Sequence, residues 1–181
     1  QPAIAVESEL RLLPPAQQGL VIPQTVDQWA AYQVVILGDL SPNLLGSPQL
    51  QSLAAAVRER GTGLLIQAGP LYMPHAYGDA LGDLIPVKCL NRLPGLDAPI
   101  YRPFTLDLAP EGVFHEAMRL VDEPQRNRSI WLQMPPYYWC AAAERPAAGA
   151  TVLAWNPAAG GRLGSVPLIA WHRAGVGKVL F

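Results

Sequence analysis

The sequence has little charge of either sign. Only 15% of its 181 residues are charged, and the formal net charge is -1 at pH 7. A chain so close to neutrality has no electrostatic footprint for nucleic acid or for an anionic membrane surface, so we expect neither as a partner. Half of the residues are hydrophobic, which argues against an intrinsically disordered chain and provides for a substantial core.

Cysteine is also scarce. The two cysteines, Cys89 and Cys140, stand far apart, and neither belongs to a CxxC pair or has a histidine at metal-ligand spacing. This spacing argues against a zinc site and a disulfide framework, and it leaves one disulfide between the two residues open. Long hydrophobic runs are missing as well. No run approaches the roughly 20 apolar residues of a membrane-spanning helix, so we expect no membrane insertion by this segment.

Two classes of phosphate-binding motif are absent from the chain. There is no GxGxxG and no GxxxxGK[ST], so we expect no dinucleotide or nucleotide cofactor. A metal site has only weak candidates. Asp39 follows a predicted strand, but the sequence does not place Asp79 or Asp83 beside it. Because Asp39 fits the cap of the loop that it begins, we predict no metal site.

Residues 32–70 predict a strand, a helix and a second strand in succession. The first strand, 33–37, is β-branched and apolar, which is typical of a strand buried on both faces. Ser47 and Pro48 predict the start of the helix, and Gly61 predicts its left-handed end. This order favours two parallel strands joined by a covering helix, and we expect them at the centre of an α/β sheet.

The remaining elements are predicted from capping residues, alternation and turn residues. Thr25 and Gln28 fit a capping box that begins a short helix. Residues 3–12, AIAVESELRL, fit either a strand or the end of a helix, and their periodicity does not decide between the two. The other predictions are a second strand at 63–67, a loop and short helix at 71–84, a strand at 101–108, a helix at 111–120, and strands at 137–142, 150–155, 166–172 and 177–181, the last two forming a hairpin.

A family resemblance is carried by YQVVILGDLSP, QLQSLAAAVRERGTGLLIQAGP, HAYGDALGDLIPV, PPYYW, ATVLA and GVGKVLF. Across residues 24–181 the chain resembles the class I glutamine amidotransferase-like domains of large bacterial proteins. The resemblance implies a three-layer, flavodoxin-like α/β fold with a mostly parallel sheet and a C-terminal β-rich hairpin portion. We expect residues 1–181 to form a single domain excised from a longer protein.

The same resemblance implies a setting for this domain. In the family, such a domain often sits in a membrane-anchored protein, sometimes beside a von Willebrand factor A-type module. Neighbouring domains of the parent protein are therefore the expected partners. The sequence itself indicates neither a compartment nor an oligomeric state.

The family's catalytic elbow is missing from this sequence. Class I amidotransferases carry a nucleophilic cysteine in a G-x-C-x-G turn after a central strand, with a histidine and a glutamate later in the chain. A strained turn near a helix N-terminus exposes the thiolate and lowers its pKa. Here the corresponding strand runs into Ala68, Gly69 and Pro70. None of the three has a nucleophilic side chain, so we predict no catalytic residue at this elbow.

The cysteines offer only weak substitutes for that nucleophile. Cys89 follows Lys88, whose charge could in principle lower the pKa of a neighbouring thiol, but an unreactive buried or loop cysteine is the favoured explanation. Cys140 lies within the aromatic run YYWC and fits strand packing.

A ligand site is predicted at the same edge, because open α/β sheets bind ligands beyond the carboxyl ends of their strands. His75 is the most distinctive residue there, and its alternative explanation is a loop histidine bonded to a backbone carbonyl. The predicted ligand-binding residues are Asp39, Gln67, Gly69, Tyr72, His75 and Tyr77.

Three functions follow from these observations. The first is a non-catalytic amidotransferase-like module that binds a ligand or partner at the former active-site edge. The second is a hydrolase that uses His75 and nearby acids. The third is a purely structural interaction domain, in which the rest of a longer chain covers Trp131, Tyr137, Tyr138 and Trp139.

Overall fold

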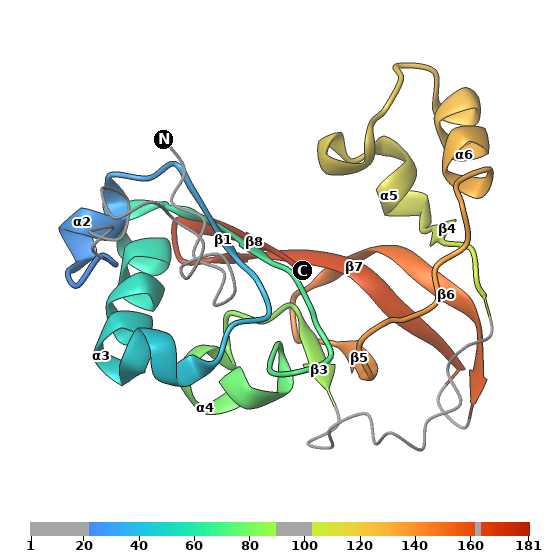
Figure 1. Cartoon of the computed structure of the whole chain (residues 1–181). Coiled ribbons are helices and arrows are strands. Elements are labelled where there is room, and N and C mark those ends of the chain that lie inside the picture. Colours follow the sequence, from blue (N-terminus) through green and yellow to red (C-terminus); the bar gives the residue numbers. More distant parts are fainter. Residues whose placement is uncertain (1–21, 90–102, 162–163) are drawn as a thin grey trace, which may run out of the picture. The chain divides into compact units, whose positions relative to one another are not determined.

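The computed structural model describes residues 22–89, 103–161 and 164–181 (Figure 1). It shows an α/β protein, which confirms the predicted class. The chain divides into two compact units, described separately below. Unit 1 comprises Gln1–Leu84 and Arg173–Val179, and unit 2 comprises Ile85–His172 and Leu180–Phe181. The prediction for residues 3–12 lies outside the described residues.

The main sheet is mixed. Its strand order is β1-β2-β8-β7-β6-β4, and β3 pairs with β5 in a second, two-stranded antiparallel sheet. Strands β1 and β2 are parallel, whereas β4 and β7 both run antiparallel to β6. The expectation of a mostly parallel sheet is therefore corrected, because hairpin strands join it. The strands are β1 (Val34–Leu37), β2 (Gly63–Ile66), β3 (Val87–Cys89), β4 (Asp107–Leu108), β5 (Ala143–Pro146), β6 (Thr151–Gly161), β7 (Gly164–Ala174) and β8 (Gly177–Leu180).

Strand β1 differs from its prediction in two ways. Among the described strands it is the first in the sheet order and not a central one, and β2 is its neighbour in that order. It is also not buried on both faces. Val34 and Ile36 are 58% and 59% exposed, whereas Leu37 on the other face is buried. An apolar, β-branched run predicts a strand well, but it does not say which neighbours that strand will have.

The helices of unit 1 begin and end close to the predicted residues. Helix α2 (Val26–Ala30) has the predicted capping box, in which the Thr25 side chain accepts from the Gln28 N–H and the Gln28 side chain accepts in return. Helix α3 (Pro42–Ala55) starts earlier than predicted, but it is kinked at Gly46, where φ is 70°. Glycine adopts such a φ without steric cost, so the helix bends at Gly46. The kink divides α3 into a first turn that was not predicted and the helix that was predicted.

The end of this helix was predicted correctly. After α3 the chain continues as a single π-helical segment, η1 (Ala56–Arg60), and stops at Gly61 with φ 83°. One apolar face along α3 and η1 is buried and consists of Leu50, Leu53, Ala54 and Val57. The short 3₁₀ helix η2 (His75–Tyr77) and α4 (Gly78–Leu81) follow within the predicted segment 71–84.

Unit 2 contains most of the wrong predictions. The helix expected at 111–120 is broken at His115 into α5 (Pro110–Phe114) and the 3₁₀ helix η3 (Glu116–Met118). The strand expected at 137–142 is reduced to one bridge between Phe104 and Tyr137. Helix α6 (Pro124–Leu132) was not predicted, because its sequence PQRNRSIWL lacks an apolar stripe.

The strands at the C-terminal end were predicted better. Strand β6 begins one residue after the predicted strand 150–155 and extends beyond it, and β7 contains the predicted strand 166–172 and is longer. The predicted final hairpin joins β7 to β8 through Gly175 and Val176. In the described part of the chain, no helix is long and apolar enough to cross a membrane.

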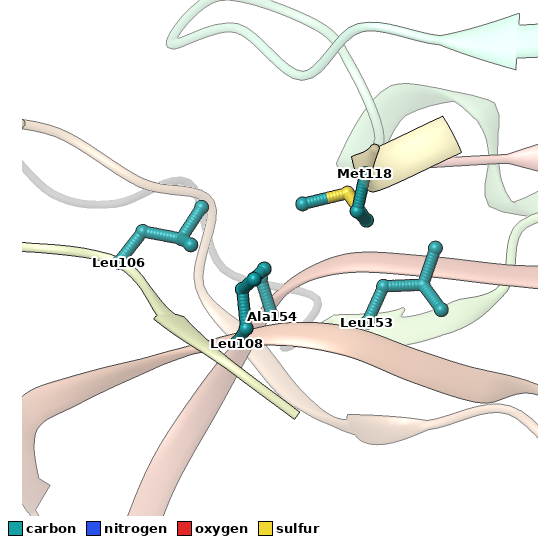
Figure 2. Packing of buried hydrophobic residues seen from close by; sticks show 5 residues of the cluster. All are labelled: Leu106, Leu108, Met118, Leu153 and Ala154. Carbon is teal, nitrogen blue, oxygen red and sulfur yellow. The ribbon is translucent and has the colours of Figure 1, made fainter. Parts of the chain in front are cut away.

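A hydrophobic cluster organises unit 2. Figure 2 shows its five buried members, which are Leu106, Leu108, Met118, Leu153 and Ala154. The buried Asn127 side chain ties α6 to this cluster, because it accepts a hydrogen bond from the Leu120 N–H (2.8 Å) and donates one to the Met118 carbonyl (3.0 Å). The Trp131 indole donates to the same carbonyl at 2.8 Å. One buried amide thus orders the chain between η3 and α6.

We predict that Asn127→Ala destabilises the protein by about 2–3 kcal/mol, because it removes the side-chain partner of a backbone N–H and one partner of a carbonyl. The measurement is chemical denaturation followed by circular dichroism. Arg126→Ala, at an exposed position of the same helix, is the matched control and should change the stability by less than about 0.5 kcal/mol. Equal losses in the two variants would contradict the role assigned to Asn127.

Candidate functional site

The candidate site lies where β1 and β2 end. The two strands are parallel, so their carboxyl ends meet at one edge of the sheet. Asp39 follows β1 by two positions, and Gln67, Ala68 and Gly69 follow β2 directly. The chain then turns through Pro70 into η2, and all of these residues belong to unit 1.

The Asp39 carboxylate is the centre of this edge. It accepts hydrogen bonds from three successive backbone N–H groups, those of Leu71 (2.9 Å), Tyr72 (2.7 Å) and Met73 (2.7 Å). The loop is closed further by a bond from the Gly69 N–H to the Met73 carbonyl at 2.9 Å. Hydrogen bonds from N–H groups to a charged oxygen are about twice as strong as neutral ones. Asp39 therefore holds the loop after β2 to the loop after β1.

Gly69 is required by this arrangement. A Cβ atom built on Gly69 would overlap the Cβ, Cγ and Oδ2 atoms of Asp39. The Asp39 side chain thus fills the space that any side chain at position 69 would need. The backbone also lacks the strained turn of a nucleophile elbow, because neither Ala68 nor Gly69 has a positive φ.

Tyr77 and His75 are held by backbone carbonyls. The buried Tyr77 hydroxyl donates to the Leu40 carbonyl at 2.9 Å. Burial, and secondarily the negative charge of Asp39, raise the pKa of Tyr77 to about 12. The His75 Nε2 atom lies 2.9 Å from the Leu71 carbonyl oxygen, which matches the alternative explanation given for this histidine.

The predicted site residues therefore divide into two groups. Asp39, Gly69 and Tyr77 belong to one internal network, and Tyr77 is too buried to line an open ligand surface. Gln67 is exposed, and Tyr72 and His75 are half-buried at the same edge. The sequence analysis missed Leu71, which is 62% exposed. The sequence feature that could have identified Leu71 is its hydrophobic side chain within a turn.

The two cysteines lie in unit 2, and both are free thiols, so the disulfide that the sequence left open is not formed. Burial and then the nearby Glu144 raise the pKa of Cys89 to about 11, which is opposite to the lowering considered from Lys88. Burial also raises the pKa of Cys140, although a hydrogen bond from Asn156 opposes the shift. Thiols with raised pKa values carry little thiolate at neutral pH and are poor nucleophiles.

Acidic residues do not form a metal centre in the part of the chain that the structure describes, where no group of three or more histidine, cysteine, aspartate and glutamate residues could hold an ion. Asp39 is committed to the loop amides, and Asp83 forms an ion pair with Arg58 at 3.1 Å.

Comparisons with known proteins give information on the fold alone. No protein-family model matches the chain, and no curated protein matches it. Among solved structures, the chain is similar to the cytoplasmic protein STM3548 from Salmonella typhimurium, with a TM-score of 0.60 and 18% sequence identity. The match covers 89% of this chain and 63% of that one, so the chain spans less than two thirds of the similar protein.

We predict that Gly69→Ala destabilises the protein by about 3 kcal/mol, because the added methyl group overlaps the Asp39 side chain. The measurement is equilibrium unfolding in urea. Gly78→Ala is the matched control, since an added Cβ there meets nothing within 4 Å and the backbone is helical. That variant should be neutral or more stable by about 0.5 kcal/mol. A tolerated alanine at position 69 would contradict the packing described for Asp39.

The raised pKa of Tyr77 predicts a loss of stability at alkaline pH. Its folded-state pKa of about 12 lies above the ordinary value of 10.0, so the neutral phenol stabilises the fold fully below pH 10. This contribution is lost as the pH rises through about 12. Tyrosinate absorbance of the wild type minus that of Tyr77→Phe should show a group titrating near 12. A difference titration centred near 10 would refute the prediction.

Proposed function

We propose that this chain is a non-catalytic, glutamine amidotransferase-like module that binds a ligand or a protein partner at the carboxyl edge of β1 and β2. The proposal joins the family resemblance of the sequence to the contacts at this edge. It assigns the edge a recognition role in place of acyl-transfer chemistry.

The contact between Asp39 and Gly69 carries the proposal. A nucleophile elbow needs a reactive side chain on a strained turn, with surroundings that stabilise a thiolate. Here the space at position 69 is filled by a carboxylate that is already bonded to three N–H groups. The arrangement leaves neither a nucleophile nor room for one at this position.

The same contacts support a binding role. The loop that follows β2 is fixed from within by Asp39, so its outward side chains are held at little entropic cost. Those side chains include the exposed Gln67, the exposed Leu71, and the half-buried Tyr72 and His75. An amide, an isobutyl group, a phenol and an imidazole on a rigid loop provide both apolar contact and hydrogen bonding.

A hydrolase that depends on His75 has less support. The imidazole Nε2 atom of His75 already forms a hydrogen bond with the Leu71 carbonyl. The hydrogen-bond partner of this nitrogen is therefore a backbone group and not an acid or a nucleophile. One observation favours the third candidate function, a structural interaction domain: Tyr138, which belongs to unit 2, is 58% exposed. Trp131 supports it less, since this residue packs on the hydrophobic cluster of unit 2.

Ammonia release from L-glutamine tests the proposal. We expect the wild-type chain, Cys89→Ala and Cys140→Ala to give the same rate as buffer, because both thiols have raised pKa values and both lie outside unit 1. The two variants are matched controls for each other, since each keeps the other cysteine. Glutamine hydrolysis by the wild type that either substitution abolishes would overturn the proposal.

A further inference from the structure

Three successive backbone N–H groups in the loop after β2 converge on one point. The Oδ2 atom of Asp39 accepts from the Leu71 N–H at 2.9 Å. The Oδ1 atom accepts from the N–H groups of Tyr72 and Met73, both at 2.7 Å. Consecutive N–H groups that converge in a turn form a concave site for an anion. In this chain the anion that fills the site is one of its own side chains.

The loop also has support that does not involve Asp39. The carbonyl groups of the same three loop residues are bonded as well, in chain order to Nε2 of His75 (2.9 Å), the N–H of Ala76 (2.7 Å) and the N–H of Gly69 (2.9 Å). The three residues lie between two prolines, whose rings fix φ. We therefore expect their N–H groups to remain convergent when the Asp39 side chain is removed.

The space that the Asp39 side chain fills has the size of a small carboxylate. Beyond its Cα atom this side chain is a methylene group and a carboxylate, which are the heavy atoms of acetate. Gly69 bounds the space, because a Cβ atom built there would overlap Cβ, Cγ and Oδ2 of Asp39. Asp39 is half-buried and the adjoining Leu71 is exposed, so solvent reaches this part of the loop. Asp39→Gly would open a space for acetate, and Asp39→Ala would leave room for formate.

We propose that the N–H groups of Leu71, Tyr72 and Met73 form a binding site for a small carboxylate anion, which Asp39 occupies as a built-in ligand. The site accepts external acetate or formate once this side chain is removed. In the wild-type chain external anions do not displace Asp39, because a tethered ligand competes at a high effective concentration. The inference goes beyond the proposed function and does not rest on it, since that function uses the outward side chains of the loop and not these N–H groups.

Urea unfolding of the full chain in sodium acetate, formate or chloride at equal concentration tests the proposal. Acetate at about ten times its dissociation constant should raise the ratio of folded to unfolded Asp39→Gly about tenfold relative to chloride. If this variant is unfolded in chloride, acetate should restore the circular dichroism of the folded chain. No gain of either kind in acetate would overturn the proposal.

The size of the anion gives a matched comparison. Formate should stabilise Asp39→Ala more than acetate does, because the acetate methyl group would overlap the alanine Cβ atom. Wild type and Asp83→Ala should respond equally to acetate and chloride, since Asp83 is an exposed carboxylate of the same unit outside the loop. An equal gain for Asp83→Ala and Asp39→Gly would identify a general salt effect and refute the site.

A blocked variant and nuclear magnetic resonance locate the anion. Gly69→Ala added to Asp39→Gly places a methyl group where the Asp39 atoms lay, so acetate should lose its stabilising effect. In Asp39→Gly, the amide signals of Leu71, Tyr72 and Met73 should shift with one common dissociation constant as acetate is added. Stabilisation that survives the block, or acetate-dependent shifts that leave these three amides unchanged, would refute the assignment.

Discussion

Three backbone N–H groups converge on the carboxylate of Asp39, and the carboxyl edge of the parallel strands depends on this convergence. Removing a carboxylate from water is costly unless hydrogen bonds replace its hydration. The N–H groups of Leu71, Tyr72 and Met73 provide them, and in doing so they fix the loop after β2. The absence of a side chain at position 69 follows from where this side chain lies. Burial raises the pKa of Tyr77, and the charge of Asp39 raises it further.

The same charge explains why the amidotransferase chemistry is not one substitution away. A cysteine at position 69 would first have to displace the Asp39 side chain, because its Cβ would overlap that side chain. A thiol left beside the carboxylate would have its pKa raised by the negative charge, whereas a catalytic thiol needs a lowered one. The missing nucleophile and the filled elbow are therefore parts of one arrangement.

Local signals in the sequence predicted local structure well. The capping box of Thr25 and Gln28, the left-handed stop at Gly61 and the final hairpin each depend on a few adjacent residues, and each was confirmed. The place of β1 in the described sheet depends on strands far along the chain. Helix α6 lacks an apolar stripe, and the buried Asn127 that holds it bonds to residues of η3 and the segment after it.

The site shows the same division between local and distant information. Its residue types and its place at the ends of two strands followed from the sequence, because parallel strands must end at one edge. Asp39 was interpreted as the cap of its own loop, but the sequence of that loop did not reveal that its carboxylate accepts hydrogen bonds from the loop after β2. Its partners, however, lie in a loop more than thirty positions away, and no periodicity or motif connects the two segments. The sequence did not predict the overlap between Asp39 and a side chain at position 69, because these two positions are also far apart along the chain.

The four residues of β1 connect this site to the edge of the sheet. Asp39 is positioned by β1, and the Gln67 N–H, just beyond β2, donates to the Leu37 carbonyl at 2.9 Å. Strand β1 pairs with β2 over four residues, and local opening of so short a strand costs less free energy than global unfolding. Each such opening would release the Asp39 carboxylate from the loop amides and disorder the loop after β2.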